Sequence, residues 1–363
     1  MITYIDLREL DPFSSGKIHG EKAKELIEKN VITTCDRFRR AGIEKETAKA
    51  EAILWSKKCS PEYLAECHGI AVGCGLELID IFMLNFRIEI AQPRQAYQLM
   101  KMPTKKVDIG VPECTLFSIR DDNGTVMATG QNLDGLASVG GCLVVTKKHS
   151  KCGTIISVQE AGVVGTSIGF SSNGFSLVYA GLIMESCTRP RNGLPVRAYF
   201  HEILNKDSFT EVLSYISSSS PPCAIAAVLT SARENKVIIS EFLEEGVTIR
   251  HSTARVETHA NHATMPSECS SLFERHLPDS EDREKRLKYL LKDNENDSID
   301  LIKHALGDHE NYPTSICLHS KENILKEKKA ATLCGAIIDW RTYTLHLSYG
   351  QPCRNKWSSF NIT

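Results

Sequence analysis

Residues 112–135 read PECTLFSIRDDNGTVMATGQNLDG, and this stretch decides how the chain folds. The runs TLFSIR and TVMATG have the composition of β-strands, and the Asn123-Gly124 pair between them is a strong hairpin signal. The polar connector that precedes them, KMPTKKVDIGVPE at 101–113, mixes Lys, Pro and Gly without periodicity, which is typical of an exposed segment. Cys114 is therefore expected at the head of the first strand of a β-hairpin.

The two sides of this cysteine differ in pattern. Residues 1 to about 100 are dominated by apolar residues at helical spacing, as in GKIHGEKAKELIEKN, ETAKAEAILWSKK and PEYLAECHGIAVGCG. After Cys114 come short strands bounded by Gly and Asn-Gly turns, interrupted by helical segments near 194–219 and 282–306, and a final strand pair near 331–350. Nearly continuous apolar runs such as AIAAVL and LCGAII favour stacked antiparallel sheets covered by helices, so we expect an α+β protein rather than a parallel α/β fold.

Composition excludes several classes of protein. The 43 Lys and Arg residues against 45 Asp and Glu give a net charge of -2 without a basic cluster, so neither nucleic acid nor an anionic membrane is an expected partner. No segment approaches the roughly 20 apolar residues of a membrane span, and the charged start MITYIDLREL does not resemble a secretion signal. We expect a soluble cytoplasmic protein that acts on a small molecule or peptide.

The chain is rich in cysteine, and most of its cysteines are expected to have a structural role. The 13 cysteines are an odd number without a CxxC pair, which fits neither a simple disulfide framework nor a zinc ribbon. Most are expected to be small buried hydrophobes, among them Cys142 and Cys334 within apolar strand patterns. Cys114 differs by its position: if the peptide bond after Glu113 is cut, the new chain begins with a thiol nucleophile beside its own α-amino base.

Motifs along almost the whole chain carry a family resemblance. In order they are GKIHG, HGIAVGCGLELIDIFMLNFRIEI, ECTLFS, NGTVMATGQNLDG, EAGVVGTSIGFSSNGFSLVY, CTRPRNGLP, THANH, DSEDREKRLKYLL, NYPTSIC and AATLCGAIIDW. Together they resemble the acyl-coenzyme A:6-aminopenicillanate acyltransferase family of N-terminal nucleophile hydrolases. The resemblance implies a four-layer αββα sandwich, in which a helical α segment, 1–113, and a β segment, 114–363, form one compact domain and stay associated after cleavage.

The same resemblance implies roles for individual residues. Cys114 is the nucleophile, Asp134 at the end of QNLDG orients the new α-ammonium, and Asn261 in THANH donates to the oxyanion. Asp134 could instead be an ordinary turn residue before Gly135. Gln131 and Asn132 are expected to build the same corner as Asp134.

Two positions depart from the family's pattern. Lys329 stands where the penicillin enzyme carries an Arg, and Lys cannot make the same planar bidentate contact. Lys329 could equally belong to the solvated charged run KENILKEKK. Glu113 stands where a Gly commonly precedes the nucleophile, and Glu restricts the backbone before the scissile bond, so cleavage could be slow or absent.

Further matches allow either a structural or a site role. Tyr312 and Ser315 in NYPTSIC are candidates for binding substrate, and packing is the alternative. Ser280 and Arg283 match a Ser-x-x-Arg pattern, with helix capping as the structural reading. The His19-Gly20 and Asn85-Phe86-Arg87 matches are expected to secure the α segment to the β segment. His259 and His262 flank Asn261, but no third ligand is apparent in the sequence, so no metal site is expected.

The sequence thus predicts a self-processing amidohydrolase or acyltransferase that works through a Cys114 thioester on an acyl amide or acyl-CoA. It requires no cofactor, although an acyl-CoA could serve as co-substrate. Whether water or an amine accepts the acyl group stays open. Two alternatives remain: an unprocessed, catalytically silent binding protein of the same fold, and a Cys-His hydrolase that uses His259 or His262 without self-cleavage.

Overall fold

The structure is a computed structural model that describes residues 2–102, 114–151, 153–189, 192–267, 269–276, 279–292, 298–320 and 330–363. Glu113, Lys329 and most of the 101–113 connector lie outside the described residues. The predicted roles of these two residues therefore stay predictions.

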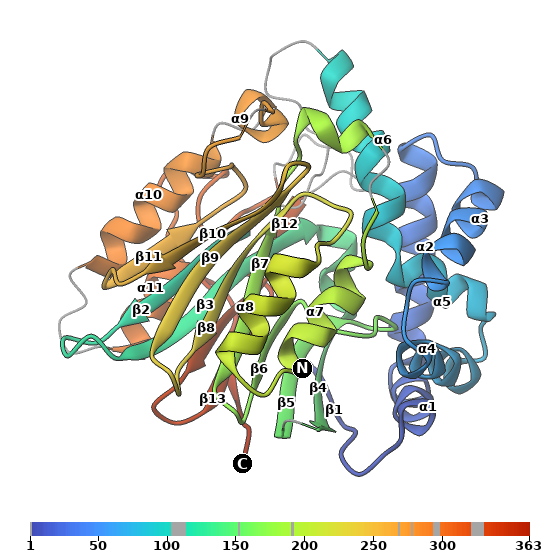
Figure 1. Cartoon of the computed structure of the whole chain (residues 1–363), viewed down its shortest axis with the longest axis horizontal. Helices are drawn as coiled ribbons and strands as arrows, with labels where there is room; N and C mark the ends of the chain where they lie inside the picture. The colour runs from blue at the N-terminus through green and yellow to red at the C-terminus, as the bar shows by residue number, and fades with distance from the viewer. Residues whose placement is uncertain are drawn as a thin grey trace.

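Two β-sheets form the centre of the molecule (Figure 1). The larger sheet has eight strands in the order β1-β4-β5-β6-β7-β8-β9-β10, antiparallel except for the parallel pair of β1 and β4. Its strands are β1 (Thr3–Asp6), β4 (Leu143–Ser150), β5 (Gly153–Glu160), β6 (Ile168–Ser171), β7 (Phe175–Gly181), β8 (Ile225–Ser231), β9 (Lys236–Leu243) and β10 (Gly246–Ser252).

The smaller sheet has six antiparallel strands in the order β11-β2-β3-β12-β13-β14. Gly124, with a positive φ of 77°, lies in the turn between β2 and β3, as the Asn-Gly signal predicted. The strands are β2 (Cys114–Arg120), β3 (Val126–Leu136), β11 (Val256–His259), β12 (Ala330–Asp339), β13 (Thr344–Tyr349) and β14 (Trp357–Asn361).

Helices fall into an N-terminal group and a group that covers the sheets. The N-terminal helices are α1 (Pro12–Lys22), α2 (Lys24–Arg40), α3 (Lys45–Ser56), α4 (Pro61–Cys74), α5 (Leu78–Asn85) and α6 (Arg87–Lys101). The later ones are α7 (Val196–Leu204), α8 (Phe209–Ser218), α9 (Leu272–His276), α10 (Asp279–Lys292) and α11 (Ile299–Leu306), with short 3-10 helices at Ala137–Cys142 and Glu185–Thr188. None of these described helices is both long and apolar enough to cross a membrane.

Three apolar clusters define four layers. Side chains of both sheets meet in a shared core, where β2 and β3 pack against β7 and β8. A second cluster joins the outer face of the larger sheet to α7 and α8, and a third joins the outer face of the smaller sheet to α10 and α11. The order helix, sheet, sheet, helix confirms the predicted αββα sandwich. Strands such as β8, whose seven residues are all buried, are covered on both faces, which explains their unbroken apolar runs.

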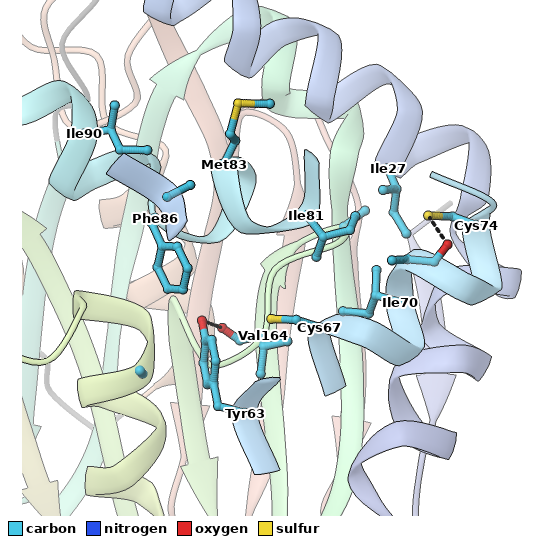
Figure 2. Packing of buried hydrophobic residues seen from close by; sticks show 14 of the residues in the cluster. Ile27, Tyr63, Cys67, Ile70, Cys74, Ile81, Met83, Phe86, Ile90 and Val164 are labelled. Atoms are coloured by element: carbon cyan, nitrogen blue, oxygen red, sulfur yellow. Dashed lines mark hydrogen bonds between the residues drawn. The ribbon is translucent and has the colours of Figure 1, made fainter. Parts of the chain in front are cut away.

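The N-terminal helices form their own apolar cluster beside the sheets, shown in Figure 2. Tyr63 of α4 and Phe86, which follows α5, stack with ring centroids 6.4 Å apart, and the Tyr63 hydroxyl donates to the Val164 carbonyl at 3.1 Å. Two of these helices, α1 and α4, begin where helix-capping rules predict. Asp11 and Ser60 each precede a proline and accept a backbone N–H of the first turn.

Three buried polar contacts attach the N-terminal helices to the end of β5 and the loop that follows it. His19 accepts from the Gly162 N–H at 3.1 Å, Asn85 donates to the Gly162 carbonyl at 2.9 Å, and Arg87 pairs with Glu160. Burial lowers the pKa of His19 to about 4, so the ring is a neutral acceptor at neutral pH. The expectation that these residues secure the α segment to the β segment is confirmed.

The sequence patterns missed several elements. β1 was not predicted, so the N-terminal third, although mostly helical, also supplies an edge strand to the larger sheet. The short strands β6, β11 and β14 were also missed, because four or five residues carry too little periodicity to be read.

Helices α1 and α4 cross with their backbones in contact. A Cβ at Gly16 would overlap the Glu66 carbonyl oxygen, and one at Gly69 would overlap the Phe13 carbonyl oxygen. Gly20 and Gly73 face each other one turn further along. These glycines are fixed by close approach, because any side chain would force the helices apart.

We expect Gly69→Ala to lower the free energy of unfolding by on the order of 3 kcal/mol, since the obstruction is backbone and cannot rotate away. Urea denaturation followed by circular dichroism would measure this. Gly140→Ala is the matched control, because its Cβ would lie 3.4 Å from Leu333 Cδ2, an ordinary contact. Equal midpoints for the two variants would contradict the close crossing.

Candidate active site

Sheet topology places Cys114 and Asn261 side by side. β2 lies between β11 and β3, and its pairing with β11 sets His259 opposite Leu116. Because the strands are antiparallel, Asn261, two residues beyond the end of β11, comes level with Cys114. On the other side Cys114 pairs with Leu133, which precedes Asp134. The three residues predicted as nucleophile, oxyanion donor and ammonium partner are thus brought to one place.

Hydrogen bonds hold the backbone of Cys114 on both sides. Its N–H donates to Asn261 Oδ1 at 2.6 Å, and its carbonyl accepts from Arg283 Nη1 at 2.7 Å. The same guanidinium donates to Thr115 Oγ1 at 2.8 Å and to Asn261 Oδ1 at 3.1 Å. Cys114 itself is 3% exposed, so its backbone has little freedom to move.

Both the oxygen and the nitrogen of the Asn261 side-chain amide form hydrogen bonds. Its oxygen accepts from Cys114, and its Nδ2 donates to the Gly181 carbonyl at 2.9 Å. An NH₂ group carries two donors, so this contact leaves the predicted oxyanion role chemically open. The positioning of the Cys114 nitrogen by Asn261 was not predicted.

Helix α10 supports the site, which the sequence reading underestimated for Ser280 and Arg283. Ser280 Oγ accepts from the Asn261 N–H at 2.8 Å, and Arg283 is 2% exposed. Asp279 lies 3.6 Å from Arg283 Nε and partly balances its charge. Ser280 lies inside the helix and anchors the Asn261 loop, so capping does not describe its role. The available signal was an Arg placed one turn after a Ser, on the face of α10 that faces the sheet.

Asp134 is a buried carboxyl with an elevated pKa. Its Oδ1 accepts from Thr332 Oγ1 at 2.6 Å, while Oδ2 has no hydrogen-bond partner among the described residues. Burial raises the pKa of Asp134 to about 7, and the nearby Arg283 charge limits the rise. The side chain therefore exchanges its proton near neutrality, which suits a group that orients or relays protons.

Cys114 and Asp134 line one cavity of about 120 Å³. A cavity of roughly 150 Å³ accepts a benzene ring, so the enclosed space fits a small acyl group or ring. Part of its wall is apolar, formed by Leu133, Leu136, Val139, Leu182, Ile183 and Leu333.

Another part of the wall is cationic. Arg37, Arg87 and Arg197 surround one carboxylate, Glu160, which pairs with Arg87 and lies 3.8 Å from Arg197 Nη2. Burial opposes ionisation of Glu160, but the three guanidinium groups hold the pKa of its carboxyl below its usual value. The guanidinium of Arg197 also lies 5.4 Å from the centroid of the Tyr179 ring. Three positive charges against one negative charge make this end of the cavity attractive to an anion.

Sequence reasoning missed this cationic wall. The signal was present, since Arg87 and Arg197 interrupt the apolar runs MLNFRIEI and LPVRAYF. A charged residue inside a buried pattern needs a partner, and Glu160 provides it. Sequence spacing could not show that three separate segments converge there.

The two histidines beside Asn261 are engaged elsewhere. His259 bonds Glu241 Oε1 at 2.8 Å and the Ala260 carbonyl at 2.8 Å. Burial opposes the charge on His259, but Glu241 raises the pKa of the ring above its usual value. His262 contacts Ser280 Oγ at 2.8 Å and Glu284 Oε2 at 3.1 Å. With both ring nitrogens occupied, neither histidine has the geometry of a base for Cys114.

Other predicted residues lie away from the cavity. Ser315 is buried and donates to the Cys317 carbonyl at 2.8 Å, and Tyr312 is 60% exposed; neither is among the described residues that line the cavity. Gln131 accepts from the Tyr179 N–H at 3.0 Å, whereas Asn132 donates to the carbonyls of Leu306 and Ile316, each at 2.8 Å. Gln131 and Asn132 thus face opposite sides of β3 instead of building one corner.

The layered fold, with a cysteine at the head of an inner strand and a cavity beside it, is of the N-terminal nucleophile hydrolase type. The sequence profile of the acyl-coenzyme A:6-aminopenicillanic acid acyl-transferase family matches residues 119–354, well over half of the chain. The chain belongs to this family.

Individual proteins are similar to this chain at low sequence identity. An acyl-coenzyme A:6-aminopenicillanic-acid-acyltransferase 40 kDa form of Emericella nidulans is 27% identical over 346 residues, covering 94% of this chain and 85% of that protein. Penicillin V acylase from Agrobacterium tumefaciens aligns with a TM-score of 0.47 and 14% identity, covering 69% of this chain and 86% of that one. A Caenorhabditis elegans N-acylethanolamine-hydrolyzing acid amidase ortholog aligns with a TM-score of 0.46 and 12% identity, covering 62% and 92%.

The elevated pKa of Asp134 predicts a pH-dependent stability. The carboxyl ionises in the unfolded chain above about pH 4 and in the folded chain only near pH 7, so ionisation favours unfolding across this window. From pH 5 to pH 7 the free energy of unfolding should fall by on the order of 3 kcal/mol relative to Asp134→Asn.

Both proteins would carry Cys114→Ala, so that intact chains are compared, and urea denaturation at each pH gives the two free energies. Parallel pH profiles with and without Asp134→Asn would show that this carboxyl does not titrate near neutrality.

Proposed function

We propose that this protein is a self-processing acyltransferase or amidohydrolase in which Cys114 carries the acyl group as a thioester. The observation that carries the proposal is the fixing of Cys114 by Asn261 and Arg283 at the wall of a cavity. Membership of an acyltransferase family supports the same reaction class.

Processing would begin at the bond between Glu113 and Cys114. The thiol adds to the carbonyl carbon of residue 113, the C–N bond breaks, and the Cys114 nitrogen leaves as an amine that takes up a proton. Water then hydrolyses the resulting thioester and releases a carboxylate on residue 113 and a free thiol. Glu113 in place of a Gly gives the chain less freedom to bend before this bond, so we expect slow processing.

Turnover would use the same sulfur. The thiol proton passes to the α-amine, the thiolate attacks the acyl carbonyl, and the oxyanion accepts from Asn261 Nδ2 and backbone N–H groups. The amine product leaves with the proton of the α-ammonium, and water or an acceptor amine then releases the acyl group. Removing one oxyanion donor typically costs on the order of 10² to 10³ in turnover.

Arg283 would favour the neutral form of the α-amine, which is the form that acts as a base. An ordinary α-amine has a pKa of about 7.7 to 8.0. A buried guanidinium that contacts the carbonyl of the same residue disfavours a second positive charge nearby. The amine would therefore be neutral in a larger fraction at neutral pH. Asn261 Oδ1, which accepts from the nitrogen of Cys114, would orient its lone pair toward the thiol.

The cavity indicates a class of substrate. Its apolar part suits the acyl group, and the wall of Arg37, Arg87 and Arg197 suits a carboxylate on the acyl or amine side. The enclosed volume of about 120 Å³ is too small for a coenzyme A, so an acyl-CoA would place only its acyl end there.

The two alternative functions, a Cys-His hydrolase and a silent binding protein, differ in how far the described contacts support them. A Cys-His hydrolase has no support from His259 or His262, whose ring nitrogens are engaged by other groups. A catalytically silent binding protein remains the competing outcome of the turnover experiment.

Turnover can be tested with acyl-CoA thioesters and N-acyl amines, the amines offered in pairs with and without a carboxylate. We expect release of free thiol or amine, and the carboxylate member should react roughly 10- to 100-fold faster, the effect of one to two charge-assisted hydrogen bonds. Including an acceptor amine separates transfer from hydrolysis.

Cys114→Ala should lower turnover by on the order of 10⁴-fold or more. Cys59→Ala is the matched control and should leave turnover unchanged, because burial raises the pKa of this half-buried thiol to about 12 and it lies outside the described cavity lining. Turnover that survives Cys114→Ala, or no turnover with any substrate, would support the silent binding protein instead.

A further inference from the structure

Four side chains with metal-ligating atoms converge away from the Cys114 cavity. They come from the loop after α11 and the turn after β13, and their ligand atoms all lie within 4.8 Å of one another: His309, Cys317, His319 and Cys353. This is the one such grouping of His, Cys and acidic side chains in the described ranges. We propose that these four residues bind a single tetrahedral divalent cation of the zinc type.

The distances between ligand atoms match that geometry. Cys317 Sγ lies 3.5 Å from Cys353 Sγ and 3.6 Å from His319 Nε2. Cys353 Sγ lies 3.4 Å from His319 Nε2. His309 Nε2 lies 3.1 Å from His319 Nε2. Zinc bonds of about 2.3 Å to sulfur and about 2.0 Å to nitrogen give tetrahedral edges of roughly 3.3 to 3.8 Å, so these four distances need to change by only a few tenths of an ångström. The ligand atom of His309 lies within 4.8 Å of both sulfurs, so His309 completes the tetrahedron after a larger side-chain shift.

The chemistry of the four ligands fits a structural site. Two thiolates and two neutral imidazoles neutralise a divalent charge, and four protein ligands leave no open position for catalysis. The carboxylate of Asp308 does not compete for the cation, because both of its oxygens accept from Arg286 at 3.2 and 2.8 Å.

Backbone hydrogen bonds that do not involve the cation hold the loop after α11. The Cys317 N–H donates to the Asp308 carbonyl at 3.1 Å, and the His319 N–H donates to the Pro313 carbonyl at 3.1 Å. The Tyr312 ring lies 6.1 Å from the His309 ring and 5.4 Å from the His319 ring, measured between centroids. Tyr312 thus covers the histidines of this cluster.

The cation would join two segments that are distant in sequence. Cys353 lies 34 residues beyond His319 and 36 beyond Cys317. In the part of the chain between Cys317 and Cys353, the Leu318 N–H donates to Thr332 Oγ1 at 2.9 Å. The site would therefore fasten the turn after β13 to the loop that precedes β12. Such a site would differ from the sequence expectation that no metal is bound and that these cysteines only fill the core.

Little in the sequence indicates this site. One residue stands between Cys317 and His319, and His309 precedes Cys317 by eight positions, which follows none of the regular zinc spacings. Cys353 comes from a different turn, and only the pairing of β12 with β13 brings that turn close.

The test measures metal in the full-length protein purified with a thiol reductant and without chelator. After the protein has been exposed to zinc and dialysed, we expect elemental mass spectrometry to find one zinc ion per chain. Cobalt(II) in place of zinc should give the visible absorption of a tetrahedral cobalt thiolate, a readout that needs no variant.

Cys353→Ser removes an exposed ligand and should weaken zinc binding at least 10-fold, whereas the matched Cys59→Ser should keep full binding. If Cys353→Ser does not fold, His309→Ala, another exposed ligand, is measured in its place. Folded wild-type protein without zinc or the cobalt band would overturn the proposal. So would full zinc binding by either ligand variant, or a metal-free protein lighter by two hydrogens, which would indicate a Cys317–Cys353 disulfide.

Discussion

The pair of hydrogen bonds that holds Cys114 is the interaction on which the rest of the site depends. Asn261 fixes the nitrogen of the residue and Arg283 fixes its carbonyl oxygen, so the head of β2 cannot turn. Each partner is in turn fixed: Asn261 by Ser280, and Arg283 by its burial in α10 against the smaller sheet. A strand end would ordinarily fray, and these hydrogen bonds oppose fraying at the head of β2. The proposed nucleophile would need this degree of positioning beside its own α-amine.

Charge burial is the second constraint on the site. Burial raises the pKa of Asp134 to about 7, and the buried Arg283 guanidinium lies against the Cys114 carbonyl. At the other end of the cavity, Glu160 keeps its charge only because arginines surround it. The cavity thus combines a proton-exchanging end near the sulfur with an anion-attracting end, and a substrate that is apolar in the middle and anionic at its tip would satisfy both.

Much of the fold could be predicted from sequence because its signals are local. The hairpin at Gly124, the helix starts at Asp11 and Ser60, and the doubly buried strand β8 each follow from a turn, a cap or an apolar run. Cys114 could also be placed, because it stands where helical periodicity gives way to strands. The edge strand β1 could not be read from four residues, since its partner β4 begins 140 residues after it in the chain.

The parts of the site that were missed depend on distant contacts. Arg283 matched a Ser-x-x-Arg pattern that allowed either a structural or a site role, and only the packing of α10 on β2 brings it to Cys114. Arg37, Arg87 and Arg197 come from three helices, and Cys353 reaches Cys317 only through strand pairing. Tyr312 and Ser315 show the opposite error, because a local match suggested the substrate cavity and the fold placed them beside the Cys and His cluster.

The most direct measurement is the intact mass of the purified full-length protein, recorded at once and after incubation at neutral pH, beside Cys114→Ala. We expect the wild-type chain to convert into two associated fragments that meet between residues 113 and 114, and the variant to stay whole. An active wild-type preparation that remains a single chain, or a Cys114→Ala chain cut at the same bond, would contradict the role of Cys114 as the self-processing nucleophile.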